Sequence, residues 1–169
     1  MKLNSLEDLL HHELKDLYSA ETQLVKALPK MANAAQSEQL STLINHHLTE
    51  TQTQVERLTE GLKMLDARAR AKPCKGMMGL IEEGDEVMSE GKKLEPAGAD
   101  LALIGAAQKV EHYEMAGHIT ARNLAQQLQM PNLVQLLQLS LAEEENADQL
   151  LNQLARPLMS AARMPEPVA

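Results

Sequence analysis

The sequence has very few aromatic residues and almost no cysteine. It contains no Trp, no Phe and two Tyr, so its core must be built from aliphatic side chains and Met. The single cysteine, Cys74, excludes an intramolecular disulfide framework and a metal site with four thiolate ligands. No apolar run approaches the ~20 residues of a membrane-spanning helix, and the N-terminus lacks the apolar segment of a secretion signal. We therefore expect a cytoplasmic protein with no membrane partner.

Basic residues are also too few for a nucleic-acid-binding protein. The chain has 16 Lys and Arg against 24 Asp and Glu, which gives a formal net charge of -8. Because phosphate contacts need a basic surface, this balance argues against nucleic acid as a partner. Leu, Ala, Gln and Glu are abundant and β-branched residues are sparse, a composition that favours helices over strands.

Apolar residues recur every three or four positions along four long stretches, which predicts four amphipathic helices. Ser5 and Asp8 have the spacing of a capping box at the start of the first helix. Pro29 should kink that helix or end its regular part, because proline cannot donate a backbone hydrogen bond. We expect the helices at about residues 5–35, 38–65, 100–129 and 132–156.

A long connection, residues 66–99, separates the two helical pairs. It contains a short amphipathic stretch at about 77–89, and its length allows it to carry the chain from one end of a bundle to the other. Two helical hairpins joined by one long crossover predict an all-α, ferritin-like four-helix bundle with a short extra helix. We expect one domain over residues 1–156 and a loosely ordered tail over 157–169, which holds three Pro.

Six acidic residues fall in register with these apolar stripes, where a helical core normally has leucine. Facing carboxylates inside a bundle would repel one another unless cations lay between them. Residues three or four apart share a helix face, so two ligands from one helix can reach the same pair of metal ions. The six are Glu21, Glu50, Glu111, Glu114, Glu144 and Asp148, and each of the four helices supplies at least one.

The heights of these acids along the helices also agree. In each predicted hairpin, the central carboxylates lie about four turns from the connecting loop. Glu21 and Glu50 therefore share one level in the first hairpin, as Glu111 and Glu144 do in the second. For any one of these residues, a solvated surface acid is the simpler interpretation. Six at matching heights predict a dinuclear metal centre.

The usual histidine ligands are missing from their expected places. Ferritin-like dimetal centres carry two Glu-x-x-His pairs, but Thr53 and Ala147 stand three residues after Glu50 and Glu144. An all-carboxylate centre should favour hard ions such as ferric iron, or manganese.

Three other polar residues lie on the same stripes. His47 and His118 are one turn from the acids, where each is a candidate ligand, a candidate donor to a ligand carboxylate, or a hydrogen-bonded core histidine. Gln54 is a candidate donor of its amide to a ligand carboxylate. The sequence leaves these alternatives open.

Several short segments form a specific combination, and they are DLYSAE at 16–21, HLTET at 47–51, GLIEE at 79–83, QKVEHYE at 108–114 and EEE at 143–145. With these segments the chain resembles the YciE/YciF family of bacterial ferritin-like stress proteins, and its YciF branch more closely, over nearly its whole length. The resemblance implies a rubrerythrin-like four-helix fold, a dimetal centre, a homodimer and induction under stress.

Together these features predict a stress-response protein that binds two metal ions, iron or manganese. Such a centre could react with peroxide or dioxygen, although the sequence does not establish that the protein is an enzyme. One alternative is a non-catalytic, stress-induced structural dimer in which metal only holds the bundle together. Iron storage is a weaker alternative, because the fold alone does not specify a cage.

Overall fold

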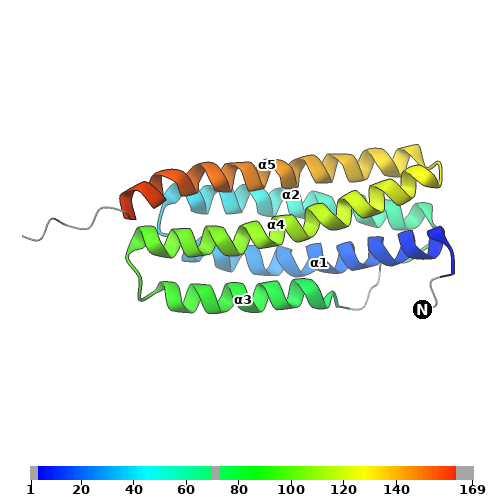
Figure 1. The fold of residues 1–169 in the computed structure, drawn as a ribbon. Coiled ribbons are helices and arrows are strands. Elements are labelled where there is room, and N and C mark those ends of the chain that lie inside the picture. Colours follow the sequence, from blue (N-terminus) through cyan, green and yellow to red (C-terminus); the bar gives the residue numbers. More distant parts are fainter. Residues whose placement is uncertain (1–3, 70–72, 163–169) are drawn as a thin grey trace, which may run out of the picture.

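Helices make up nearly all of the described chain, which comprises residues 4–69 and 73–162 of this computed structural model. None of these helices combines the length and the apolar character of a membrane span. The described part has five helices, and they are α1 (Leu6–Ala34), α2 (Glu38–Met64), α3 (Lys75–Gly91), α4 (Pro96–Gln127) and α5 (Pro131–Ala162) (Figure 1).

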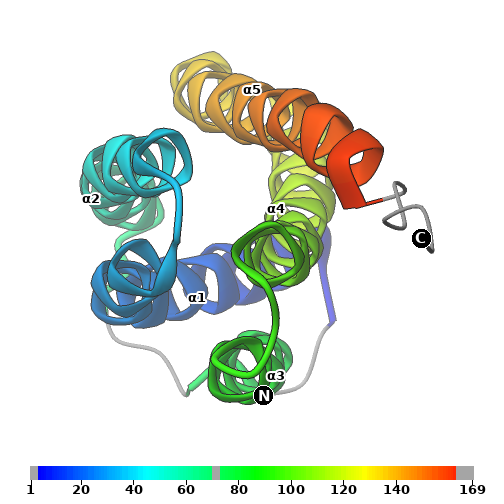
Figure 2. The same cartoon turned by 90° about the vertical axis from the view of Figure 1, so that its left-hand side faces the viewer.

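The four long helices form a closed ring around a common core. Helix α1 packs against α2 and α4, and α5 packs against the same two helices from the opposite corner. The shorter α3 lies outside this ring, beside α1 and α4 (Figure 2). It runs back along the bundle and so carries the chain from the end of α2 to the start of α4 (Figure 1). The predicted ferritin-like arrangement, two hairpins joined by a long crossover with an extra helix, is confirmed.

Side chains satisfy the free backbone groups at the starts of α1 and α2, as the sequence indicates. Ser5 Oγ accepts a hydrogen bond from the Asp8 N–H at 3.0 Å. The Asp8 carboxylate accepts in turn from the Asn4 N–H at 3.1 Å, one residue before the usual capping-box partner. At the start of α2, Ser37 Oγ accepts from the Leu40 N–H at 3.3 Å.

Two prolines lie inside helices rather than at their ends. Helix α1 continues through Pro29 to Ala34, and α5 continues through Pro157 to Ala162. The expected end of the last helix at residue 156 is therefore wrong, and residues 157–162 belong to α5 instead of a loose tail. Both prolines are exposed, so the peptide N–H that each lacks would have been on the water-facing side. The rest of the predicted tail, residues 163–169, lies outside the described residues.

A buried aspartate joins the first hairpin to the second, which the sequence did not reveal. Asp100, near the start of α4, is 2% exposed. Its carboxylate accepts from the Gln36 N–H at 2.7 Å and from the Ser37 N–H at 2.9 Å, in the turn between α1 and α2. These charge-assisted bonds fix the end of the bundle where α2 and α4 both begin.

Apolar side chains form two separate core clusters along the bundle. One surrounds Leu24, Leu28 and Ile44, and the other surrounds Leu14 and Leu58. Along each long helix, the predicted polar residues lie near the point where residues of the first cluster give way to residues of the second. The fold therefore places a polar layer in the middle of an otherwise apolar bundle.

The crossover helix is seated by a contact that only glycine permits. A Cβ atom on Gly76 would lie 2.7 Å from Tyr113 Cε2. Tyr113 cannot move freely, because its hydroxyl donates to Asp16 at 2.8 Å and lies 2.8 Å from Cys74 Sγ. We expect Gly76→Ala to lower the free energy of unfolding by about 1–3 kcal/mol through this overpacking.

The same helix offers a matched control for this prediction. A Cβ atom on Gly79 would meet nothing within 4 Å. Gly79→Ala should therefore be neutral, or should stabilise the protein by up to about 1 kcal/mol through helix propensity. Urea denaturation followed by circular dichroism measures both variants, and equal stability of the two would contradict the proposed contact.

Candidate metal centre

Two overlapping groups of buried ligand side chains lie in the polar layer. His47, Glu111, Glu114 and Glu144 form the first group, and in it one ligand atom from each residue lies within 4.8 Å of the others. Glu21, His118 and Glu144 form a second group by the same measure. All of these residues are at most 3% exposed. Helices α1, α2, α4 and α5 each contribute, so the whole bundle positions the centre.

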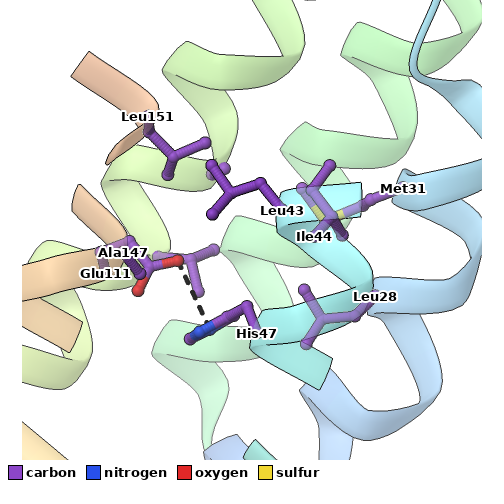
Figure 3. Close-up of a pocket in the computed structure, with 10 residues that line it drawn as sticks. Leu28, Met31, Leu43, Ile44, His47, Glu111, Ala147 and Leu151 are labelled. Carbon is purple, nitrogen blue, oxygen red and sulfur yellow. Dashed lines mark ion pairs between the residues drawn. The ribbon is translucent and has the colours of Figure 1, made fainter. Parts of the chain in front are cut away.

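Glu144 belongs to both groups, so its two carboxylate oxygens could serve two ions at once. Each group also contains one close contact between a histidine and a glutamate. His118 Nε2 lies 3.2 Å from Glu21 Oε1, and His47 Nε2 lies 3.4 Å from Glu111 Oε1. Figure 3 shows the His47 ring and the Glu111 carboxylate pointing toward one another. Each of the two groups could hold a metal ion, and Glu144 is common to both.

Most of the ligand atoms in the layer have no hydrogen-bond partner. In the described part of the chain, eleven buried side-chain nitrogen and oxygen atoms are unpaired, and nine of them belong to these two groups. Both oxygens of Glu114, both oxygens of Glu144 and both nitrogens of His47 are among them. Buried polar atoms are normally paired, because each unpaired one costs about 1–3 kcal/mol. Such a concentration of orphaned donors and acceptors fits residues that hold metal ions.

The pKa shifts of the buried residues also fit a site for cations. Burial raises the pKa of Glu114 and of Glu144 well above the usual range, and the nearby Glu21 carboxylate adds to both effects. Burial also raises the pKa of Glu111, although the His47 imidazolium partly offsets this. Burial alone would lower the pKa of His47, but the carboxylates around it, Glu111 foremost, raise it to about 9. Without metal, His47 therefore keeps its proton near neutral pH, and the shifts of the three glutamates favour their protonated forms.

Two of the six predicted ligands, Glu50 and Asp148, lie at the rim of the layer and in neither group. The side chains of these two residues are 19% and 20% exposed. Glu50 Oε2 lies 3.3 Å from His46 Nδ1 and 3.7 Å from His47 Nδ1. Asp148 Oδ1 accepts from the Gln108 amide at 2.8 Å. The other four predicted acids are brought together, and His47 and His118, left open by the sequence, join them.

Gln54 is buried at 0% exposure, but its partner differs from the predicted one. Its amide donates to Glu143 Oε2 at 3.0 Å, and Glu143 belongs to neither ligand group. The two terminal guanidinium nitrogens of Arg57 also donate to the Glu143 carboxylate, at 2.6 and 2.7 Å. Gln54 therefore ties the layer to an Arg57–Glu143 ion pair between α2 and α5. The spacing of Glu143 on its helix gave no signal for this pair.

Comparisons with known proteins agree over nearly the full length of the chain. The model of the DUF892 domain, a domain of unknown function, matches residues 5–163. Protein YciF of Escherichia coli (strain K12) is 42% identical over 156 residues, which cover 92% of this chain and 93% of YciF.

Solved structures give the same result. The crystal structure of the Escherichia coli stress protein YciF matches with a TM-score of 0.88 and 40% identity, covering 93% of this chain and 98% of that one. YcfI of Rhodopseudomonas palustris, a proposed structural protein, matches with a TM-score of 0.84 and 40% identity, covering 89% and 95%. A protein of Xanthomonas campestris, at 20% identity and a TM-score of 0.70, shares the fold. The chain therefore belongs to the DUF892 family, the family of the stress protein YciF.

Proposed function

We propose that the buried layer binds two metal ions, iron or manganese, and that the loaded centre reacts with peroxide or dioxygen in the stress response. The orphaned ligand atoms carry this proposal. In a purely structural layer, Glu114 and Glu144 would each be paired with a donor, whereas ligand atoms stay free for an ion. The description of the Escherichia coli relative as a stress protein supports the physiological role.

The charges of the layer fit two divalent ions. When ionised, the four buried glutamates carry four negative charges, and two divalent ions carry four positive charges. The sequence predicted six carboxylates and therefore a preference for trivalent ions. With His47 and His118 as ligands, the donor set becomes a mixture of carboxylate and imidazole, which suits iron in its divalent state. We therefore propose iron ahead of manganese.

A bound pair of ferrous ions would supply two electrons, which with two protons reduce one hydrogen peroxide molecule to two waters. The residues of this chain hold the ions and keep the surroundings dry, because apolar clusters lie on both sides of the layer. Binding of the ions should itself release protons, since His47 must lose the proton that it holds without metal.

Stopped-flow absorption spectroscopy tests the redox proposal. Apoprotein loaded with ferrous iron is mixed with peroxide, or with air-saturated buffer, and ferric absorption is followed. We expect oxidation faster than in buffer alone, and we expect that Glu144→Gln loses this excess rate while Glu145→Gln, an exposed neighbour, keeps it. Oxidation no faster than the buffer rate in the wild type would refute the redox function.

A second candidate function is a structural one, which the description of the Rhodopseudomonas palustris relative favours. In that case, metal would raise the thermal stability of the protein and the loaded protein would not oxidise iron. We also propose that the protein is a homodimer, as its resemblance to the family implies, and that it is cytoplasmic, as its composition suggests. Light scattering of the purified protein separates a dimer from a storage cage.

A further inference from the structure

A small apolar cavity lies directly against the candidate metal centre. Side chains from all four long helices line it, among them Leu28, Ile44 and Leu151. Among the described residues that line it, His47 and Glu111 are the polar ones, and their side chains point toward one another (Figure 3). The centre of a water-sized molecule can occupy a volume of about 10 Å³ within the cavity, so the cavity admits one very small molecule.

A wider groove lies on the surface between α2 and α5, close to this cavity. The centre of a water-sized molecule can occupy about 630 Å³ within this groove. Leu150 and Leu154 form part of its wall. Leu43 lines both the groove and the inner cavity. This half-buried side chain therefore stands between the open surface and the candidate metal centre.

The chemistry of the cavity selects the guest. Water and peroxide would lose hydrogen bonds against apolar walls, and such cavities remain dry or take up apolar molecules. Dioxygen is apolar and is one of the smallest apolar molecules, although it is somewhat larger than water. We propose that the groove and the cavity form the entry path of dioxygen to the metal centre, with Leu43 as the gate between them. This inference rests on the proposed function, because the path ends at the proposed ligands His47 and Glu111.

The path can be detected in the metal-free wild-type protein with dioxygen itself as the probe. Dissolved dioxygen is paramagnetic and speeds the relaxation of nearby methyl groups in proportion to its local concentration. Under a pressure of oxygen gas, we expect several-fold larger relaxation at Ile44 and Leu151 than at Leu58 and Leu133. The latter two are equally buried but belong to the other core cluster, away from the cavity. Equal relaxation in the two clusters would overturn the proposed path.

Two variants test the gate. Leu43→Ala removes the side chain between groove and cavity, so relaxation at Ile44 by dioxygen should rise several-fold. Leu154→Ala enlarges only the groove, and it should leave the relaxation at Ile44 unchanged. If Leu43→Ala does not exceed Leu154→Ala, Leu43 is not the gate. A third variant, Leu43→Trp, should lower the relaxation and covers the case in which the alanine variant fails to fold.

These outcomes separate the path from the proposed function. Strong relaxation at Ile44 in a protein that binds no metal would sustain the path and refute the metal centre. Rapid oxidation of bound iron with equal relaxation in both clusters would sustain the metal centre and refute the path.

Discussion

Glu144→Gln is expected to prevent the binding of both metal ions. Glu144 is the one residue that offers a ligand atom to both groups of the layer. The amide of Gln has one oxygen and no negative charge, so it cannot bridge two cations as a carboxylate does. The affinity for each ion should fall by more than the roughly 10–100-fold that loss of an outer-shell partner costs.

Two matched variants sharpen this prediction. Glu21 offers a ligand atom only to the second group. Glu21→Gln should therefore lower the affinity for one ion and leave the affinity for the other unchanged. Glu145 is the exposed neighbour of Glu144, and Glu145→Gln makes the same chemical change outside the layer. Isothermal titration calorimetry with ferrous iron under anaerobic conditions measures all three. Wild-type affinity in Glu144→Gln would contradict the assignment of Glu144 as a bridging ligand.

Glu114→Gln is expected to have opposite effects on stability and on metal binding. Neither carboxylate oxygen of Glu114 has a hydrogen-bond partner, and burial raises the pKa of this group well above its usual range. Gln cannot ionise, so the metal-free variant should be more stable than the wild type at alkaline pH, where Glu114 loses its proton and would carry an uncompensated buried charge. The same change alters a proposed ligand, so it should weaken metal binding.

The pH dependence of stability follows from the same pKa shifts. The pKa of Glu114 is higher in the folded protein than its ordinary value of 4.5, so folding takes up a proton between these two values. The stability that this group contributes is complete below pH 4.5 and is lost as the pH rises through the folded-state pKa. His47 acts in the same direction, with its contribution complete below 6.5 and lost as the pH rises through about 9.

We therefore expect the metal-free protein to lose stability steadily from weakly acidic to alkaline pH. Urea denaturation in the presence of a chelator measures this slope. Glu114→Gln should have a shallower slope than the wild type, and Glu145→Gln should have the wild-type slope. Stability that is flat or rises with pH would contradict the proposed state of the layer. Added metal should stabilise most at high pH, where the ligands have already lost their protons.

The sequence predicted the bundle well because its helices are long and strongly periodic. Inner leucines such as Leu14 and Leu58 occur at regular spacing, and few other arrangements can bury them all. The helix ends were less predictable. Pro157 is a strong local signal for a helix end, but the last turn of α5 continues past it with the proline on the exposed face.

The polar layer was only partly predictable. The spacing of residues along a helix shows which face is buried, but it does not show which residue of that face points directly into the core. On α2, Thr51 is 0% exposed while the neighbouring Glu50 lies at the rim, so the inner stripe passes through the threonine. On α5, Ala147 is 3% exposed while the neighbouring Asp148 lies at the rim. A carboxylate one position off the centre line fits a period of three to four residues as well as one on it.

The two histidines lie in the layer although the sequence did not identify them as ligands. His47 and His118 do not form Glu-x-x-His pairs with the acids on their helices, so no motif marked them as ligands. Their positions became informative only when other helices brought acids to them, Glu111 from α4 to His47 and Glu21 from α1 to His118. Contacts between helices of this kind depend on how the helices are rotated against one another, and one helix's spacing does not contain that information.

Elemental analysis of the metal content tests the central claim most directly. The protein is purified without chelator, stripped, and reconstituted separately with ferrous iron and with manganese. Ions bound loosely at the surface are removed by gel filtration, and Glu144→Gln serves as the control. We predict two ions per chain for the wild type with iron and close to none for the variant. Less than one ion per chain with both metals would contradict the account.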